Sequence, residues 1–573
     1  MRSTAQADGV SVHAIAGTNC VILAMDAEPA ARQDLKGFAI RSGHPGSDEG
    51  RWLRGFKFFE DLVPDPQPGE RRSTLDHPIQ SFLWGHYSAT PDRAFRYTVR
   101  PLYGDPGDLR AGTDVVVDVR TEAEDRGQHA VFFNRGAIPS QKFADLFGNQ
   151  GPADVNDPTA EDVWWLSRGL LRAALGFIGQ ARGPRFELRA AAYEFSYRPI
   201  LDAFAQAAAS GAGVRVVYEA GQRKEKGVLK DTSTTVGNRE AIRDAGLRDQ
   251  QNLTLIERTR RRAIPHNKFI ILLEDGHPVQ VWTGSTNFTP SGFLGQANVG
   301  HIVRDEAVAR AYLAYWNELA SDPEPEPLQD WCSAHSPRPG DGPPPVGITP
   351  IFSPRQRSKM LDWYGDRVEA ATQTVMLTAA FGVTRRLAER FDNDRDFLRF
   401  LIMERRNRSP ETQAMLERDI DTRIALGAAL NRDAIELKLG GHRLDEWYRR
   451  EEHFRRRGHV FYVHTKIMLV DLLTDDPLVF TGSANFSPNS LLSNDENMLL
   501  IRGDTGVADV YLTEFTRLFN HFYFRHIAQK LAGEGRGDPS KAAFLDPTDG
   551  WVRRYFAPGT YHSRRRELFR ARL

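Results

Sequence analysis

The chain has 573 residues, of which 40% are hydrophobic and 26% charged, a composition typical of a folded protein with a sizeable core. Its 75 basic side chains balance its 75 acidic ones, which excludes a strong overall attraction to polyanions. No apolar stretch approaches twenty residues and no run of signal-peptide length opens the chain, so we expect no transmembrane segment and a cytoplasmic protein. Cys20 and Cys332 lie far apart and lack metal-ligand spacing.

The first 125 residues predict an all-β domain. Short strands are expected over 10–25, 37–40, 79–87, 95–103 and 115–119, separated by Pro, Gly and Asp. Phe95, Tyr97 and Val99 alternate with polar residues, as in a half-buried strand. We therefore predict a β-sandwich over 1–125. Residues 95–103 resemble a fibronectin type III-like strand, so we expect this domain to pack on the rest of the chain or to present substrate to it.

Two later regions, 126–320 and 347–573, predict α/β structure. In the first, strands are expected over 129–133, 186–193 and 214–218, with helices over 162–180 and 200–209. In the second, strands are expected over 350–352, 375–381 and 397–403, with a helix over 356–372. Alternating strands and helices indicate α/β sandwiches. Residues 321–346 are Pro-rich and acidic without periodicity, which predicts an extended linker.

A pair of short motifs occurs twice, at one constant separation. His266-Asn-Lys268 is followed by Gly-Ser285-Thr-Asn287, and His464-Thr-Lys466 is followed by Gly-Ser483-Ala-Asn485. Every element of the second set lies 198 residues after its counterpart in the first. The joint recurrence indicates an internal duplication.

Both copies predict a strand, a turn and a second strand. The apolar runs 269–273 and 467–470 follow the lysines, and 279–282 and 478–480 lead to the Gly-Ser motifs. Residues i and i+2 of a strand share a face, so the histidine and lysine of each copy point the same way. Each copy therefore supplies half of a site.

The residue types are suited to phosphoryl transfer. A histidine can carry protons near neutral pH, and its imidazole can attack phosphorus. With two histidines, one attacks a phosphodiester while the other protonates the leaving oxygen and later takes a proton from water. Lys268, Lys466, Asn287 and Asn485 supply donors to the charged oxygens. This scheme requires no metal and no other cofactor.

The motifs resemble those of the phospholipase D superfamily of phosphodiesterases, His-x-Lys-x4-Asp followed by Gly-Ser-x-Asn. The second copy matches through His464, Lys466, Asp471, Ser483 and Asn485. The first copy has Leu273 at the aspartate position, with Glu274 one place later. The resemblance implies two tandem α/β sandwich repeats that form one bilobal catalytic unit acting on a phosphodiester.

The copies also differ at one further position. Glu496 stands where the family commonly has an acid that hydrogen-bonds a catalytic imidazole, and its counterpart is Asn298. We expect Glu496 to partner His464 and Asn298 to partner His266, so that the two histidines titrate differently. The resemblance assigns attack to His266 and acid–base work to His464. The residues alone leave that order open, and they also leave open that the first copy is losing its function.

Arginines gather before both histidines. Arg258, Arg260, Arg261 and Arg262 precede His266, and Arg443, Arg449, Arg450, Arg455, Arg456 and Arg457 precede His464, interleaved with Trp447, Tyr448 and Phe454. Arginine with aromatic residues is typical of surfaces that grip backbone phosphates and stack bases. We therefore predict substrate binding by Arg449, Arg450, Arg455, Arg456 and Arg457. The alternative is a solvated helical face on which Glu446, Glu451 and Glu452 pair with the arginines.

Three functions follow as hypotheses. The first is a nuclease, favoured by the arginine–aromatic segment. The second is a phospholipase D acting on glycerophospholipids, which the two copies in one chain fit equally well. The third is a non-catalytic binding protein that keeps the fold, suggested by Leu273 and Asn298. A shared fold cannot decide between the substrates.

Overall fold

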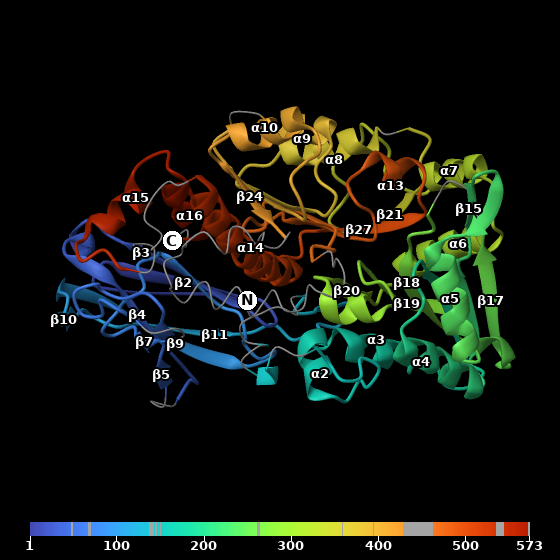
Figure 1. Ribbon diagram of the computed structural model, residues 1–573, viewed down its shortest axis with the longest axis horizontal. Helices are drawn as coiled ribbons and strands as arrows, with labels where there is room; N and C mark the ends of the chain where they lie inside the picture. The colour runs from blue at the N-terminus through green and yellow to red at the C-terminus, as the bar shows by residue number, and fades with distance from the viewer. Residues whose placement is uncertain are drawn as a thin grey trace.

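The computed structural model describes residues 1–46, 50–66, 70–136, 143, 146–148, 151–259, 264–357, 359–392, 395–427, 462–534 and 544–570, with backbone alone at 524–534. Three bodies of structure follow one another along the chain: an all-β region, then two α/β repeats (Figure 1).

The N-terminal region is all-β, as predicted. One sheet has the order β1-β2-β3-β8 and the other β10-β9-β4-β5, with β11 also paired to β9. Side chains of both sheets share one core, in which Val12 packs with Tyr97 and Val117. The region 10–25, expected as one strand, is a hairpin of two. The strands are β1 (Arg2–Ala7), β2 (Val10–Ala16), β3 (Val21–Ala27), β4 (Leu35–Gly43), β5 (Gly50–Trp52), β6 (Arg54–Gly55), β7 (Arg72–Ser73), β8 (Leu83–His86), β9 (Ala94–Asp105), β10 (Asp108–Ala111) and β11 (Val115–Arg120), with the short helix η1 (Ala30–Arg32).

The first repeat is built on a seven-stranded sheet of order β12-β20-β19-β18-β13-β14-β17. Its strands are β12 (His129–Phe133), β13 (Phe186–Ala192), β14 (Gly213–Glu219), β17 (Leu253–Arg258), β18 (Lys268–Glu274), β19 (His277–Gly284) and β20 (Val299–Val303), with a separate hairpin of β15 (Gln222–Glu225) and β16 (Val228–Asp231). Its helices are α2 (Glu161–Ser167), α3 (Leu170–Ile178), α4 (Arg198–Ala209), α5 (Ser233–Asp244), η2 (Leu247–Asp249), η3 (Ser291–Gly295) and α6 (Glu306–Ala320).

The second repeat has a sheet of the same topology, β21-β27-β26-β25-β22-β23-β24. Its strands are β21 (Gly347–Ser353), β22 (Thr374–Ala379), β23 (Leu398–Met403), β24 (Thr422–Leu426), β25 (Ile467–Val470), β26 (Leu478–Gly482) and β27 (Glu496–Arg502). Its helices are α8 (Met360–Glu369), α9 (Arg385–Phe391), α10 (Pro410–Arg418), α13 (Pro488–Leu492) and α14 (Thr505–Glu534). Strand for strand the two sheets correspond, as the duplicated motifs predict.

The helix expected over 162–180 is interrupted. Arg168 and Gly169 have φ angles of 44° and 87°, a left-handed conformation that ends α2 and starts α3 in a new direction. The Arg168 guanidinium is buried and forms an ion pair with Glu514 of α14 at 2.5 Å. The break therefore positions a buried arginine, which apolar periodicity does not predict.

The prediction of an extended linker over 321–346 is wrong in part. This region contains α7 (Pro325–Ala334), which has a proline in its first turn. Leu328 and Cys332, one helical turn apart, are fully buried in a core shared with β18 and α6. A single buried pair is too short a pattern to show a helix in a Pro-rich sequence.

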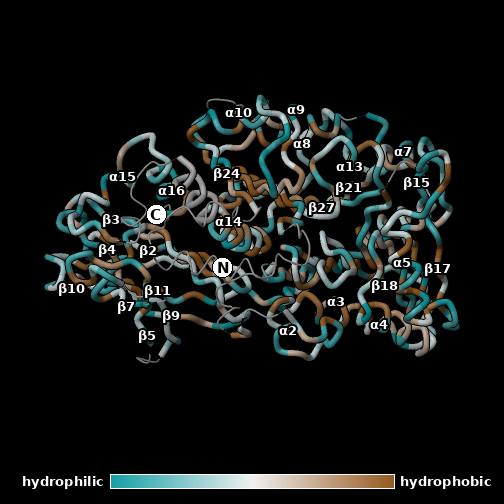
Figure 2. Tube along the Cα trace, viewed as in Figure 1, coloured by the Kyte–Doolittle hydropathy of each residue, from teal (hydrophilic) through white to brown (hydrophobic). Residues whose placement is uncertain are grey.

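Helices cover both outer faces of the paired sheets, and two helices lie between them. Helices α2, α3 and α4 pack on the first sheet and α8, α9 and α10 on the second. Helix α6 packs on β18 and β19 and also contacts Phe352 and Leu499 of the second repeat, while α14 packs on the second sheet and on β12. Hydrophobic segments accordingly run through the interior near β24, β27 and α14, and hydrophilic ones lie outside, near β10 and β15 (Figure 2).

The last described helices return to the N-terminal sheets. They are η6 (Gly550–Val552), α15 (Arg553–Phe556) and α16 (Tyr561–Phe569), drawn in red beside the blue strands in Figure 1. Trp551, Val552 and Tyr555 belong to the sandwich core, and the Trp551 indole N–H donates to the Leu35 carbonyl at 2.8 Å. The β-sandwich core is thus completed by residues from the other end of the described chain.

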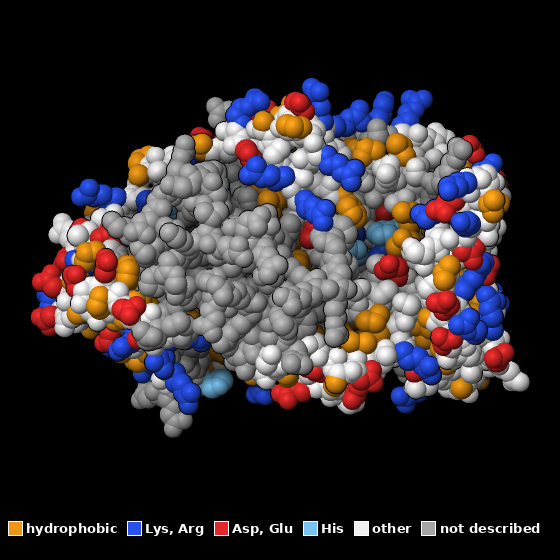
Figure 3. Space-filling view, viewed as in Figure 1, with side chains coloured by type: hydrophobic (Ala, Val, Ile, Leu, Met, Phe, Trp, Pro, Cys, Tyr) orange, Lys and Arg blue, Asp and Glu red, His pale blue; other side chains and the backbone are white. Residues whose placement is uncertain are grey.

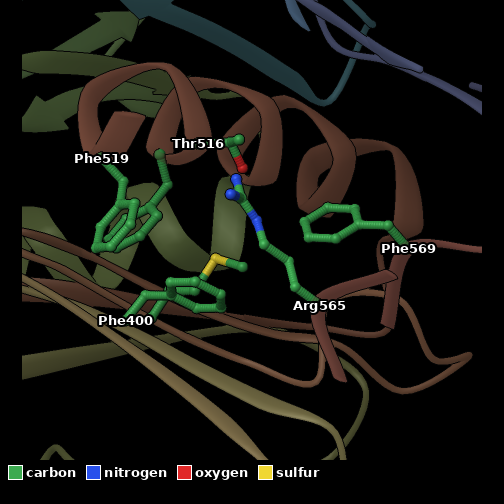
Figure 4. Close-up of a pocket in the computed structure, with 7 residues that line it drawn as sticks. Phe400, Thr516, Phe519, Arg565 and Phe569 are labelled. Carbon is green, nitrogen blue, oxygen red and sulfur yellow. The ribbon is translucent and has the colours of Figure 1, made fainter. Parts of the chain in front are cut away.

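A small pocket lies where α14 and α16 meet the second sheet (Figure 4). Phe400, Phe519 and Phe569 line it, with Arg565 and Thr516, and no motif residue does. Within the part of the chain that the structure describes, every helix is too short or too polar to cross a lipid bilayer.

Candidate active site

The two motif copies meet where the repeats join. His266 lies just before β18 and His464 just before β25. Two backbone bridges link the repeats beside them, Pro265 with Asp495 and Ala297 with Val463. The amide of Ala297 donates to the Tyr462 carbonyl at 2.7 Å, and the amide of Asp495 donates to the Ile264 carbonyl at 3.0 Å. Val463 lies 198 residues after Pro265, and Asp495 lies 198 residues after Ala297, so each bridge joins the counterparts of the residues in the other. The repeats are therefore joined with approximate twofold symmetry.

The partners of the two histidines are exchanged between repeats. His266 Nδ1 lies 2.9 Å from Glu496 Oε2, and His464 Nδ1 lies 2.9 Å from Asn298 Oδ1. The predicted pairing of each histidine with the residue of its own copy is therefore wrong. Because Asp495 is bridged to Pro265, the next residue, Glu496, faces the histidine of the other repeat.

Both serines of the Gly-Ser motifs hold these partners in place. Ser285 Oγ donates to Asn298 Oδ1 at 2.8 Å, and Ser483 Oγ donates to Glu496 Oε2 at 2.7 Å. The preceding glycine is required for this approach, since a Cβ at Gly284 would collide with the Val299 carbonyl. The serine hydroxyls therefore orient the acceptors of the histidines.

The lysines lie at the bottom of the site. Lys268 Nζ donates to the His266 carbonyl at 2.5 Å, and Lys466 Nζ donates to the His464 carbonyl at 2.6 Å. Both side chains are at most 1% exposed. Lys268 Nζ also lies 5.3 Å from the ring centre of Tyr193. Each ammonium group has three protons, so further protons remain for a bound anion.

Burial makes every charge in this cluster unfavourable. It lowers the pKa of Lys268 to about 7 and that of Lys466 well below its ordinary value, and it raises the pKa of Glu496 to about 7. Burial, reinforced by the charges of both lysines, lowers the pKa of each histidine well below 6.5, and the charge of His266 further lowers the pKa of His464. These five side chains thus share one electrostatic environment, in which a bound anion would favour the protonated lysines and histidines.

The motif asparagines complete the cluster. Asn287 Nδ2 donates to a carboxylate oxygen of Glu194, a residue that the sequence did not single out. The Oδ1 atoms of Asn287 and Asn485 are buried and accept no hydrogen bond among the described residues. Buried polar atoms without partners are rare in folded proteins and are often found at functional sites.

The motif aspartate has a structural task away from the histidines. Asp471 accepts hydrogen bonds from the amides of Thr372, Gln373 and Thr374 at 2.8, 2.7 and 3.0 Å, which fixes the start of β22. The amide of Asp471 donates to the Thr374 carbonyl at 2.9 Å.

The first copy has Leu273 at this position. Leu272 pairs with Leu188 as Val470 pairs with Val375, so the next residue, Leu273, occupies the place of Asp471. Leu273 is buried in the core. Because Asp471 holds backbone amides and contacts neither histidine, the leucine removes no group from the site.

The predicted substrate-binding arginines, Arg449, Arg450, Arg455, Arg456 and Arg457, lie outside the described residues, as do Arg260, Arg261 and Arg262. Arg258 is fully buried and forms ion pairs with Asp495 at 2.9 Å and Asp322 at 2.5 Å, so it supports the junction between the repeats. Within the described ranges no three His, Cys, Asp or Glu side chains are grouped to hold a metal ion.

Exposed basic side chains follow Glu404, whose carboxylate accepts from the amide of Val463, the residue before His464. Arg405, Arg406 and Arg408 follow β23 and are exposed, and Phe381, after β22, is 69% exposed. Figure 3 shows histidine side chains in a hollow to the right of centre, with Lys and Arg side chains above it. The rim on this side is thus basic and partly aromatic.

Two segments of the chain, 176–320 and 410–519, match the family model described as cardiolipin synthase, PLD-like domain. Each segment contains one copy of the His-x-Lys and Gly-Ser-x-Asn motifs. No curated protein matches the sequence.

Three solved structures are each similar to part of this chain. Phosphatidylserine synthase of Haemophilus influenzae is 14% identical over 64% of this chain and 91% of its own, with a TM-score of 0.41. Polyphosphate kinase of Porphyromonas gingivalis is 11% identical over 61% of this chain and 47% of its own, less than half its length, with a TM-score of 0.37. The phospholipase D family member Nuc of Salmonella typhimurium is 24% identical over 26% of this chain and 86% of its own, with a TM-score of 0.20.

Proposed function

Because this chain belongs to the phospholipase D superfamily, we propose that it hydrolyses phosphodiester bonds through a phosphohistidine formed on His266, and that its substrate is nucleic acid. The observation that carries the proposal is the hydrogen bond between His266 and Glu496, which joins the two motif copies into one site.

In the first step, His266 Nε2 attacks phosphorus and the bond from phosphorus to the leaving oxygen breaks. The leaving oxygen takes the proton from Nε2 of His464, whose protonated form is favoured once the negative charge of the diester offsets the effects of burial and of the nearby positive charges, which lower its pKa. Glu496 accepts a hydrogen bond from the Nδ1–H of His266, which keeps the proton on Nδ1 and leaves the Nε2 lone pair free to attack. The carboxylate also offsets the positive charge that the imidazole acquires when it is bonded to phosphorus.

In the second step, His464, now neutral, takes a proton from water. The water oxygen attacks phosphorus, the phosphorus–nitrogen bond breaks, and a phosphate monoester leaves. Asn298 is a neutral partner for His464 and favours its protonated form less than a carboxylate would. A histidine that loses its proton readily suits the acid of the first step.

The phosphoryl oxygens are held by Lys268 and Lys466 and by the side-chain amide of Asn485. Both lysines are positioned by the carbonyl of their own histidine, so donor and proton carrier move as one unit. Donors fixed in a buried site stabilise the charge that develops on these oxygens better than water does.

Nucleic acid is the substrate that the rim of the site supports best. Arg405, Arg406 and Arg408 offer charge to successive phosphates, and exposed Phe381 offers a surface for a base. The composition of the arginine–aromatic segment before His464, including Arg449 and Arg455, also favours a nucleic-acid substrate.

We assign the N-terminal β-sandwich, whose fibronectin type III-like character stays a proposal, a supporting role. Ile15 and Ile22 of its strands pack against α14 and the second sheet. Through this contact the sandwich would stiffen the second repeat.

A panel of substrates tests the proposal. Purified protein is incubated with end-labelled single- and double-stranded DNA, RNA and phosphatidylcholine vesicles, with His464→Ala as the inactive control. We expect cleavage of an oligonucleotide by the wild type alone. Cleavage of phosphatidylcholine alone would replace nucleic acid by phospholipid as the substrate, and no turnover of any diester would favour a non-catalytic binding protein.

A further inference from the structure

Glu194 is a carboxylate placed among the groups that would bind an anion. It follows the end of β13, where its carbonyl accepts from the Phe288 amide at 3.1 Å. The preceding residue, Tyr193, donates its amide to the Asn267 carbonyl at 3.0 Å. The backbone around Glu194 is thus bonded to both motif segments of the first repeat and has little freedom to move.

The side chain of Glu194 faces the same space as the phosphate donors. It accepts a hydrogen bond from Asn287 Nδ2. Burial raises its pKa, and the charges of Lys268 and Lys466 oppose that rise, so both lysines act on this carboxylate. Glu194 therefore borders the space in which a phosphoryl oxygen held by Lys268 would lie.

The second repeat has an aromatic residue at the position of Glu194. Ala192 pairs with Lys268 and Leu377 with Met468, which makes Phe381 the counterpart of Glu194. Phe381 is an exposed aromatic side chain and offers no carboxylate to Asn485. A carboxylate at this strand position is thus a property of the first repeat and not of the second.

We propose that Glu194 makes this site selective for phosphate groups with a single negative charge. A phosphodiester carries one negative charge, whereas a phosphate monoester or inorganic phosphate carries nearly two at neutral pH. A fixed carboxylate penalises the extra charge, and specificity is often built from such a repulsive element. This inference rests on the proposed phosphodiesterase function.

The same charge would act during turnover. Hydrolysis converts a diester with one charge into a monoester that loses a second proton near neutral pH. The product is then repelled by Glu194 more strongly than the substrate was, which favours its release and limits product inhibition.

Glutamine at this position separates charge from hydrogen bonding. Glu194→Gln keeps an oxygen that can accept from Asn287 but removes the negative charge. If Glu194 only positions Asn287, this variant resembles the wild type. Glu194→Asp keeps the charge, and Glu240→Gln, which removes an exposed glutamate from α5, is the matched control.

The experiment measures equilibrium binding of inorganic phosphate and of dimethyl phosphate at pH 7 by titration calorimetry. For Glu194→Gln we expect phosphate to bind about tenfold more tightly than to the wild type, which corresponds to about 1.4 kcal/mol of binding free energy. The affinity for dimethyl phosphate should stay within about twofold of the wild-type value. Glu194→Asp and Glu240→Gln should keep the discrimination of the wild type. Thermal unfolding checks that each variant is folded.

Two results would overturn the inference and are distinct. Unchanged phosphate affinity in Glu194→Gln, with dimethyl phosphate bound normally, would leave Glu194 a positioning residue while the proposed function stands. Failure of both ligands to bind the wild type and the variants would remove the phosphate site itself, and the proposed function with it.

Discussion

Glu496 of the second repeat accepts a hydrogen bond from His266 of the first, with 2.9 Å between Oε2 and Nδ1. Asn298 of the first repeat is paired in the same way with His464 of the second. Neither repeat therefore contains a histidine together with its partner, and each half depends on the other for the orientation of its imidazole.

Replacing one histidine should trap the covalent intermediate on the other. In His464→Ala, His266 can still attack a substrate with a good leaving group, such as a p-nitrophenyl phosphodiester, but the base for hydrolysis is missing. We expect mass spectrometry of quenched reactions to find a phosphoryl adduct on His266 in His464→Ala and none in His266→Ala. An adduct on His464 in the His266 variant would reverse the two roles.

The exchanged partners predict which second change matters in the His464→Ala background. Glu496→Gln should slow adduct formation on His266 about 100-fold, because the developing imidazolium loses its carboxylate. Asn298→Ala should not slow it, because the histidine that Asn298 contacts has been removed. The rate is measured by rapid quench in a single turnover. Slowing by Asn298→Ala and not by Glu496→Gln would restore the pairing within each repeat.

Anion binding should be coupled to proton uptake. Burial lowers the pKa of Lys268 to about 7 and that of Lys466 further below its usual range, and a bound anion favours the protonated lysines. Affinity for a diester analogue should therefore be highest below pH 7 and fall as the pH rises through that value. Titration calorimetry in two buffers of different ionisation enthalpy measures the protons taken up. A binding enthalpy that is independent of the buffer would contradict the coupling.

Hydrolysis should persist without divalent ions. Two lysines offset the phosphate charge in the proposed mechanism, and both lie inside the site. We expect turnover in excess EDTA to equal that in untreated enzyme. Full loss of turnover, recovered on adding one divalent ion, would require a different mechanism.

The buried ion pair of Arg258 should be important for stability. Arg258→Met leaves Asp495 buried without its positive partner, which should lower the free energy of unfolding by about 3–5 kcal/mol. The control is Arg185→Met, since Arg185 is 63% exposed and its ion pair with Asp275 should contribute at most about 1 kcal/mol. Urea denaturation compares the two. Equal losses would show that the buried pair has no special role.

Much of the site could be predicted from the sequence because the motifs are local and duplicated. The strand–turn–strand pattern around His266 and His464 and the two matching sheets follow from apolar runs and from the shared offset. The N-terminal strands follow from alternation, as in Val115, Val117 and Val119, which are all buried.

The parts that could not be predicted depend on contacts between distant segments. The partner of His266 is set by the bridge between Pro265 and Asp495, which the order of residues along the chain does not reveal. Glu194 belongs to no motif, and only the hydrogen bond from Asn287 identifies it.

The two bridges between the repeats have the geometry of an isologous interface. In a symmetric dimer, residue i of one subunit meets residue j of the other, and j meets i in return. Pro265 with Asp495 and Ala297 with Val463 are such a pair within a single polypeptide. A homodimer would have to keep both halves of this interface identical, whereas a fused chain is free to place an amide on one side and a carboxylate on the other. The site lies on the approximate twofold axis between the repeats. The difference between Asn298 and Glu496 therefore makes its two histidines unequal, and this inequality can decide which of the two ester bonds of a phosphodiester is broken.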